Sequence, residues 1–245
     1  LSHGVTYGQN AWANADLIRR FANYPSDQDP GFDLAILPIA ELEPDLSQGP
    51  NALIDLANPH FTLGPRKLFA DGAFQLQTAF LRADYHQPTR PDAARGLPYT
   101  PAAELTAQVS KLHDMGFQIH CHCNGDAGAD LFLDAVETAQ RNTPRADHRH
   151  TIIHGQLLDD DQFKRMAQLG VTVSFFSAHI YYWGDRHHDT FLGPERAARI
   201  SAAGSAQRHG VRFTLHNDAS VTPTRPIHLA HCAVNRLTAT GKLLG

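Results

Sequence analysis

The sequence predicts an α/β protein built on a parallel sheet. Short apolar segments typical of strands alternate along the 245 residues with longer amphipathic segments typical of helices. Several of the helical segments stop at a glycine, the residue that most often follows a helix. Strands that alternate with helices of about 10–15 residues form β–α–β units, which place neighbouring strands parallel to each other.

Seven segments are predicted to be strands. They are Gly4–Gln9, Phe32–Ile39, Arg66–Ala70, Phe117–Cys123, Thr151–His154, Val171–Phe176 and Val211–His216. An eighth strand would close a (β/α)8 barrel, whereas an open doubly wound sheet gives the same alternation. No glycine-rich phosphate loop follows an early strand, which argues against the dinucleotide-binding form of the open sheet.

Six segments are predicted to be helices. They are Asp16–Tyr24, Pro101–Met115, Asp126–Asn142, Asp159–Leu169, Pro194–His209 and Pro226–Thr238. Gly116, Gly170 and Gly210 are placed to end three of them, and Pro194 suits the first turn of its helix. The intervening stretch Ala83–Thr100, with its three prolines, is expected to be a long loop.

The composition narrows the class of protein. Hydrophobic residues make up 42% and charged residues 19%, which suits a packed domain and argues against disorder. A net charge of −4 with no long basic run argues against nucleic acid or an anionic membrane as partner, and favours a small-molecule substrate. Three cysteines do not form a disulfide framework, so a cytoplasmic location is expected. A homo-oligomer is left open.

The 16 histidines direct attention to metal or acid–base chemistry, and their placement decides which of them matter. His120 and His122 share one face of a predicted strand, because side chains alternate along it. Both lie at its C-terminal end, where barrel enzymes build their sites. The alternative reading is a pair of buried histidines that only make hydrogen bonds.

Three further residues lie within or at the ends of other predicted strands. His154 closes one strand, and Asp218 follows the last one, where it could equally cap the next helix. Lys67 lies inside an apolar strand, and burying an ammonium group is costly unless it is paired or chemically altered. Nitrogen and oxygen ligands that converge on one barrel mouth suit zinc or a similar divalent ion, with Asp218 as the base for a metal-activated water.

This order of residues resembles the amidohydrolase superfamily, and within it the YtcJ-like branch. The motifs that carry the resemblance span nearly the whole chain. They are Lys67-Leu68-Phe69-Ala70-Asp71-Gly72, Gln118 to Asp126, Arg149 to Gln156, Ser177 to Asp185, Leu192-Gly193-Pro194-Glu195-Arg196-Ala197 and Asn217-Asp218-Ala219.

The resemblance implies a distorted (β/α)8 TIM-type barrel and a set of roles. It makes Lys67, His122, His154 and Asp218 metal ligands on strands four, five, six and eight, with Asp218 also the general base. It implies one or two divalent ions, most simply zinc, and allows Lys67 to be carbamylated as a bridge between two ions. A loop after strand seven is expected to line the substrate pocket. The expected substrate-binding residues are His120, His179, Tyr182, Trp183 and Asp185.

The sequence departs from the family pattern in one respect. The His-x-His pair that ends the first strand in the family has no match here, so residues 1–245 are expected to be an internal barrel fragment with strands two to eight. The small β-domain is expected to be absent as well. The resemblance then predicts that this piece binds metal weakly or not at all and is inactive.

The parent enzyme is expected to hydrolyse a C–N bond in an amide, formamide or cyclic amide-like substrate. Two alternatives remain at this point. One is a catalytically inactive barrel that serves as a binding or assembly module. The other is an open-sheet α/β enzyme with a histidine-rich, phosphatase-like site.

Overall fold

The computed structural model describes residues 3–39 and 56–245, so residues 1–2 and 40–55 of the predicted domain lie outside the described part. The strand segments described are β1 (Tyr7–Ala13), β2 (Asp33–Pro38), β3 (Phe61–Leu63), β4 (Arg66–Phe69), β5 (Ile119–Cys123), β6 (Thr151–His154), β7 (Thr172–Phe175) and β8 (Phe213–Leu215). Every pairing between these strands is parallel, in the order β1-β2-β3 and then β4 to β8. The predicted parallel α/β class is confirmed.

β3 and β4 form one strand with an irregularity between them. Both lie along β2, since Ile36 pairs with Leu63 and Ile39 pairs with Lys67. The two pairs are three residues apart on β2 but four residues apart on the partner segment. The register gains one residue at Gly64–Pro65, where proline has no N–H to donate to the ladder. β3 is a strand that the sequence does not predict, and the described residues contain eight strand segments in a three-stranded and a five-stranded sheet.

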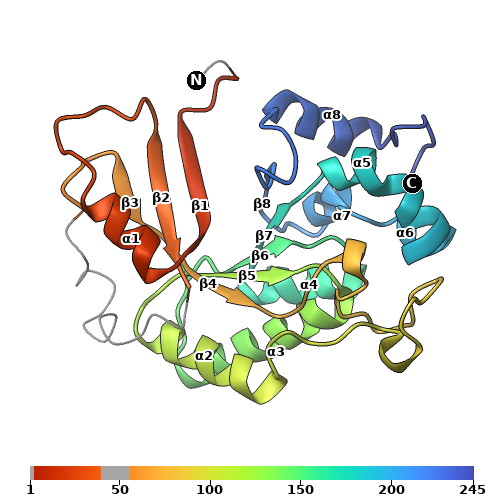
Figure 1. Ribbon diagram of the computed structural model, residues 1–245. Helices are drawn as coiled ribbons and strands as arrows, with labels where there is room; N and C mark the ends of the chain where they lie inside the picture. Colours follow the sequence, from red (N-terminus) through yellow and green to blue (C-terminus); the bar gives the residue numbers. More distant parts are fainter. Residues whose placement is uncertain (1–2, 40–55) are drawn as a thin grey trace.

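The sheet is an incomplete TIM-type barrel. Within the described residues, β1 pairs only with β2 and β8 only with β7, so the two edge strands are not paired with each other. Figure 1 shows the strands following one another from β1 round to β8, with a gap between these two edges. This is the arrangement predicted for barrel strands two to eight.

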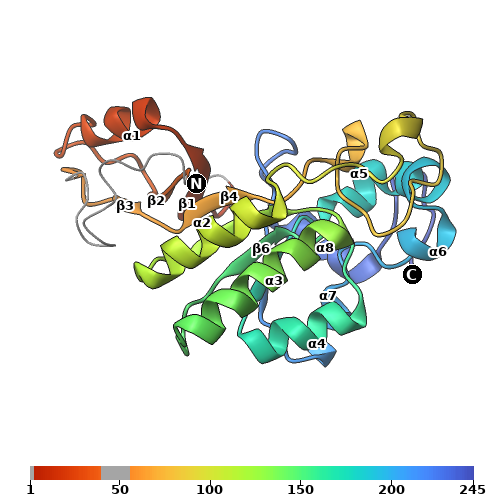
Figure 2. The same cartoon turned by 90° about the horizontal axis from the view of Figure 1, so that it is seen from below.

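Helices cover the outside of the strands. They are α1 (Ala15–Ala22), α2 (Ala102–Asp114), α3 (Asp126–Asn142), α4 (Asp160–Leu169), α5 (Ala178–Arg186), α6 (Pro194–Ala197), α7 (Ala203–Arg208) and α8 (Pro226–Asn235), with short turns η2 (Phe74–Leu76), η3 (Pro91–Ala93) and η4 (His187–Phe191). Figure 2 shows α2, α3 and α4 side by side. Among the described helices, none has the length and apolar character needed to cross a membrane.

The alternation of side chains along the strands separates the core from the site. Cys121, Ile152 and Val173 are buried in the main apolar cluster, which also contains residues of α2, α3 and α4. Their neighbours along the strands, such as His122 and Ser174, therefore point to the opposite face, the barrel interior. The strands therefore place polar side chains in the barrel interior, facing its mouth.

The prediction of one helix over Pro194–His209 is wrong. The structure has two short helices, α6 and α7, with Ser201 between them in a left-handed conformation (φ +48°). The Ser201 N–H donates to the carbonyl of Gln156 (2.9 Å), and its hydroxyl accepts from the Gln156 side chain (2.7 Å). This long-range contact ends the helix, and a periodic apolar pattern cannot reveal it.

The segment after β7 was expected to be a loop, and this too is wrong. Ala178–Arg186 forms α5, and a single π-helical turn, η4, follows it directly. Its aromatic residues and glycine are weak helix formers in isolation. Burial of Ile180 in a second apolar cluster with Phe191 supplies the tertiary packing that overrides this local preference.

The first strand is displaced from its predicted bounds. It was expected over Gly4–Gln9 but occupies Tyr7–Ala13, because its pairing with β2 continues to Pro38. The strand stops where Asn14 begins α1, since the Asn14 side chain accepts from the Leu17 N–H (2.9 Å).

Three buried histidines connect elements at the end of the barrel opposite its mouth. Nδ1 of His150 accepts from the N–H of Ile119 (3.1 Å), so its hydrogen is on Nε2 and donates to Nδ1 of His113 (2.9 Å). Nδ1 of His148 likewise accepts from the His150 N–H (2.9 Å). Backbone carbonyls accept from Nε2 of His113 and His148. Each ring therefore has one donor and one acceptor nitrogen, which is the neutral form.

We expect acid to destabilise the protein through this cluster. Burial lowers the pKa of His150 to about 2, so the unfolded chain takes up a proton near pH 6.5 while the folded one does not. This contribution is fully present above pH 6.5 and falls as the pH drops, by about 2 kcal/mol at pH 5. Urea unfolding at pH 8, 7 and 5 measures it.

The variant His150→Gln should be less stable at pH 7 but should lose about 2 kcal/mol less than the wild type between pH 7 and 5. His231→Gln, at an exposed ring of α8, should retain the wild-type pH dependence. An unchanged dependence in His150→Gln would show that this cluster does not carry the effect.

Candidate functional site

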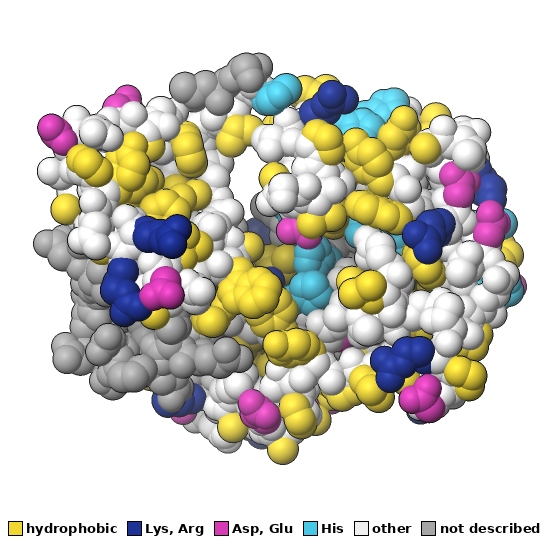
Figure 3. All heavy atoms as spheres, viewed as in Figure 1, with side chains coloured by type: hydrophobic (Ala, Val, Ile, Leu, Met, Phe, Trp, Pro, Cys, Tyr) yellow, Lys and Arg dark blue, Asp and Glu magenta, His cyan; other side chains and the backbone are white. Residues whose placement is uncertain are grey.

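Three histidines stand in a row at the mouth of the barrel. His122 lies in β5, His154 ends β6, and His216 follows β8. Nδ1 of His122 is 3.0 Å from Nε2 of His154, and Nδ1 of His154 is 3.2 Å from Nε2 of His216. We call these three residues the imidazole row. Figure 3 shows histidine side chains gathered at a hollow in the middle of this face.

The Gly72 carbonyl at one end assigns the hydrogens along the row, and the Ser174 hydroxyl at the other end can donate or accept to match. Nε2 of His122 lies 2.9 Å from the Gly72 carbonyl and 3.1 Å from the side-chain nitrogen of Asn124, which donates to the same carbonyl. We assign Nε2 as the donor to the carbonyl, a group that can only accept, which makes Nδ1 of His122 an acceptor. His154 then donates from Nε2 and accepts at Nδ1 from Nε2 of His216. At the far end, Nδ1 of His216 lies 2.9 Å from the hydroxyl of Ser174, which can donate to it. All three rings are neutral in this arrangement.

The electrostatic environment favours the same neutral state. Burial, and next the positive charge of Lys67, lowers the pKa of His122 and of His216 to about 3. Burial also holds the pKa of His154 well below its ordinary value. Neutral imidazole is the form that binds metals.

His154, His216 and Asp218 form a candidate metal centre. One donor atom from each lies within 4.8 Å of the other two, the one such group of His, Cys, Asp and Glu that the described residues contain. Two nitrogens at about 2.0–2.1 Å from a tetrahedral zinc would lie about 3.3 Å apart. The 3.2 Å between Nδ1 of His154 and Nε2 of His216 fits this, and two imidazoles with a carboxylate are a common donor set for zinc.

Two of these three residues have unusual backbone conformations. His154 (φ +78°) and Asp218 (φ +51°) are both in the left-handed region, which residues other than glycine rarely adopt. Such conformations cost roughly 1–3 kcal/mol each and cluster at functional sites. At the end of β6, the left-handed turn brings His154 into the row, although Ile152 on the same strand belongs to the core.

The four predicted metal ligands lie near one another at the barrel mouth, but only His154 and Asp218 belong to the candidate metal centre. Lys67 is buried, and burial lowers its pKa to about 8, while the negative charge of Asp218 opposes this shift. His122 contacts His154, but its other nitrogen donates to Gly72. Ligation by Lys67 and His122 stays a prediction.

The predicted substrate-binding residues lie in three different settings. Burial lowers the pKa of His120 to about 4, and its Nε2 is 3.3 Å from the Gln118 amide. The ring of Trp183 packs against His179, with 4.6 Å between ring centres, and Tyr182 is exposed. All four of these side chains remain candidates for substrate contact.

Asp185 is the fifth of them and lies apart. Its carboxylate accepts from the hydroxyls of Thr238 (3.0 Å) and Thr240 (2.8 Å), and so ties α5 to the end of the chain. The two nitrogens of His179 are also engaged, with His187 (3.1 Å) and Gln75 (3.2 Å). These bonds hold the side chains of His179 and Asp185 in place, and substrate contact by either residue stays a prediction.

His216 was missed by the sequence reasoning. The signal was present, because His216 lies two residues before Asp218, just as His120 lies two before His122. The alternation rule that placed His120 and His122 on one face also places His216 on the interior face of the last strand.

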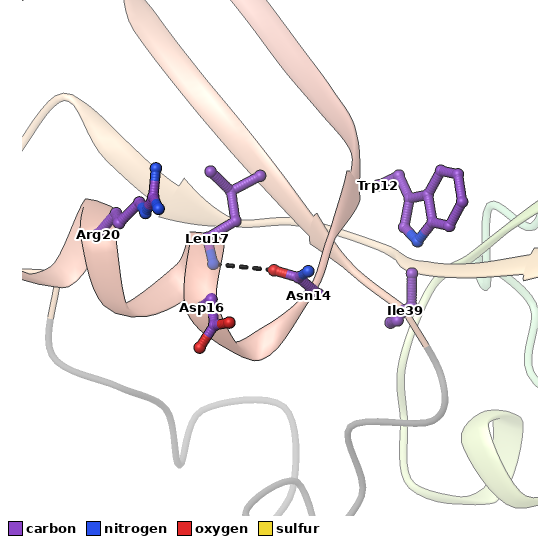
Figure 4. Close-up of a pocket in the computed structure, with 6 residues that line it drawn as sticks. All are labelled: Trp12, Asn14, Asp16, Leu17, Arg20 and Ile39. Atoms are coloured by element: carbon purple, nitrogen blue, oxygen red, sulfur yellow. Dashed lines mark hydrogen bonds between the residues drawn. The ribbon is translucent and has the colours of Figure 1, made fainter.

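A separate hollow lies beside α1. It is lined by Trp12, Asn14, Asp16, Leu17, Arg20 and Ile39, as Figure 4 shows. None of its lining residues is a predicted site residue. The Asn14 side chain in it is already used to cap α1.

Asp71 holds the loop after β4 in place, and the carbonyl of the next residue, Gly72, is the partner of His122. Its buried carboxylate accepts from the backbone N–H groups of Asn124 (2.8 Å), Gly125 (2.7 Å) and Phe80 (2.9 Å). The backbone packs so closely here that a Cβ on Gly128 would lie 2.7 Å from the carboxylate. Glycine at this position of α3 is therefore required by the approach of Asp71.

A family model described as the amidohydrolase family matches residues 2–245. The chain belongs to the amidohydrolase family. The YtcJ-like resemblance is confirmed by "Putative amidohydrolase YtcJ" of Bacillus subtilis (strain 168), which is 26% identical over 74% of this chain. The "N-substituted formamide deformylase" of Arthrobacter pascens is 26% identical over 56% of it.

Solved structures agree on the fold. An uncharacterized metal-dependent hydrolase from Pyrococcus furiosus superposes with a TM-score of 0.77 at 21% identity, over 96% of this chain and 47% of its own. One from Pyrococcus horikoshii OT3 gives 0.76 at 21% identity, over 97% and 45%. This amidohydrolase chain spans about a third of the length of YtcJ and a quarter of that of the deformylase.

We expect Asp71→Ala to lower the free energy of unfolding by about 3 kcal/mol or more, because three buried N–H groups lose their acceptor. Urea denaturation measures this. Asp92→Ala, at an exposed carboxylate in η3, is the matched control and should change stability by no more than about 0.5 kcal/mol. Equal stabilities for the two variants would contradict the anchoring role.

Proposed function

We propose that this site belongs to a metal-dependent hydrolase that cleaves a C–N bond in an amide, formamide or cyclic amide-like substrate. The observation that carries the proposal is the convergence of His154, His216 and Asp218 at the barrel mouth of an amidohydrolase. A formamide deformylase among its relatives supports this choice of bond.

Zinc is the metal that we propose, since neutral imidazole and carboxylate are donors that zinc accepts in catalytic sites. Lys67 and His122 lie beside the three donors and are the proposed ligands of a second ion. A lysine with a pKa near 8 is partly unprotonated at pH 7, and the free amine is the form that attacks CO2. Attack forms an N–C bond and releases a proton, and the carbamylated Lys67 would offer carboxylate oxygens as metal ligands.

His154, His216 and Asp218 would hold the ion, which would act as a Lewis acid on the substrate carbonyl and lower the pKa of the attacking water. The Asp218 carboxylate would accept a proton from that water and deliver it to the leaving nitrogen. Burial raises the pKa of Asp218, which makes it a better proton acceptor than an exposed carboxylate. The hydrogen bonds of His122 to Gly72 and His154 hold the ring beside this site in place.

The aromatic side chains of α5 suit an apolar part of the substrate. Trp183 lies against His179 and Phe176, and Tyr182 next to it is exposed. We propose that these rings contact the acyl or amine substituent, because substrate pockets in barrels are formed at the C-terminal ends of the strands.

The partner that we propose is a small molecule, with self-association as a further possibility. The three cysteines are free and buried, which is consistent with the proposed cytoplasmic location.

Because the three donors lie on this chain, we expect it to hold a divalent ion at His154, His216 and Asp218, whether or not a second ion binds at Lys67 and His122. This is the opposite of the weak or absent binding that the family resemblance predicts, and metal analysis with zinc titration decides between them. Loss of a residue that only hydrogen-bonds to a metal ligand typically lowers metal affinity by roughly 10–100-fold. Because His216 is a proposed ligand itself, His216→Ala should lower zinc affinity by more than this. His231→Ala, at an exposed histidine, should leave zinc affinity unchanged.

We further expect the zinc-loaded protein to release amines from a panel of N-formyl and N-acyl compounds. Asp218→Asn should reduce that rate by roughly 10²–10⁴-fold, because a positioned general base contributes this much. Turnover is followed by amine-specific fluorescence. Zinc binding without any amine release would favour the alternative, a barrel whose unpaired edges β1 and β8 serve binding or assembly.

A further inference from the structure

A pair of hydroxyl groups lies behind His216, on the side away from His154. Ser174 in β7 and Thr214 in β8 are partners in the strand ladder. The Thr214 hydroxyl donates to the Ser174 hydroxyl (2.9 Å), which itself lies 2.9 Å from Nδ1 of His216. Ser174 is buried, with 8% of its surface exposed, whereas Thr214 is exposed.

The Gly72 end of the imidazole row determines where the hydrogen of His216 lies. With that hydrogen on Nε2, the Ser174 hydroxyl donates to Nδ1 of His216 and accepts from the Thr214 hydroxyl. Nδ1 is then an acceptor, and the ring carries its single hydrogen on Nε2. That nitrogen faces Nδ1 of His154 at 3.2 Å, so the hydrogen occupies the place between two prospective ligand atoms.

A ligand atom must present a lone pair to the metal. Nδ1 of His154 already does so, because it accepts a hydrogen bond. Nε2 of His216 does not, and its hydrogen must leave before it can bind an ion. The ring can stay neutral only if Nδ1 takes up a proton at the same time, and a neighbour must then accept from Nδ1–H.

We propose that Ser174, with Thr214 behind it, is a positioning residue that selects which nitrogen of His216 is free for the metal. The inference rests on the proposed metal site. When an ion binds, the Nε2 proton leaves to solvent and Nδ1 gains one from solvent, so the charge of the ring is unchanged. The Ser174 hydroxyl turns to accept from Nδ1–H and donates to Thr214, whose exposed hydroxyl donates to water.

This reversal requires a group that can both donate and accept, as a hydroxyl can. A carbonyl can only accept, and would hold the hydrogen on Nδ1 in both states. A hydroxyl both donates and accepts, so it satisfies His216 before and after metal binding. An outer partner of this kind orients the ring and raises the basicity of the ligating nitrogen.

The same strands provide a matched control one step further from the mouth. The hydroxyl of Thr172 in β7 lies 2.8 Å from that of Thr151 in β6. Thr172 is two residues from Ser174 and so points to the same interior face. Thr172→Val removes an interior hydroxyl with little change in shape, as Ser174→Ala does.

The first measurement is the ¹⁵N NMR spectrum of the histidine rings in metal-free and zinc-titrated protein, with His216→Gln to assign the signals. His216 should carry its hydrogen on Nε2 without metal and on Nδ1 with zinc. A hydrogen on Nδ1 in the metal-free protein would overturn the proposal.

The second measurement is zinc affinity by competition with a chelating dye. Ser174→Ala should bind zinc roughly 10–100-fold more weakly than the wild type, Ser174→Thr should restore the affinity, and Thr172→Val should not change it. If the wild type binds zinc and Ser174→Ala binds it equally well, this inference alone is wrong. If the wild type takes up no zinc, the proposed function fails and the inference fails with it.

Discussion

The hydrogen bond between the Gly72 carbonyl and Nε2 of His122 constrains everything along the row of histidines that follows. A carbonyl only accepts, so Nε2 of His122 donates and Nδ1 of His122 is an acceptor. Nε2 of His154 then donates to His122, and Nε2 of His216 donates to His154. Burial and the positive charge of Lys67 favour uncharged rings in the row. In the neutral form each ring has a hydrogen-bond partner for both of its nitrogens. Neutral rings are also what a metal needs, so stability and ligation favour the same protonation state.

The loop that carries Gly72 is itself held by a buried carboxylate. Asp71 accepts three backbone N–H groups, two of them from the segment between β5 and α3. The strand that carries Lys67 and the strand that carries His122 are thus connected beyond their own ladder. Precision at the mouth comes from these backbone contacts, since a ligand must be held to within roughly 0.5 Å to work.

The inward-facing polar side chains and the strained backbone at the barrel mouth lower the stability of the fold. Six or more histidine and hydroxyl side chains face inward from β5 to β8, while the outward residues of the same strands form the main core. Left-handed conformations at His154 and Asp218 add local strain. In a purely structural barrel apolar residues would fill these positions, so their polarity is itself a sign of function.

The sequence by itself determined the class of fold, most of the parallel strands and the strands that carry or lead to Lys67, His122, His154 and Asp218. Periodicity and end signals suffice for this, because they are local properties of the chain. Only the tertiary structure decided that His216 joins His154 and Asp218, that Gln156 divides the helix predicted over Pro194–His209, and that the segment after β7 is helical. Each of these depends on atoms far apart in the sequence meeting in space, and no local pattern records that meeting.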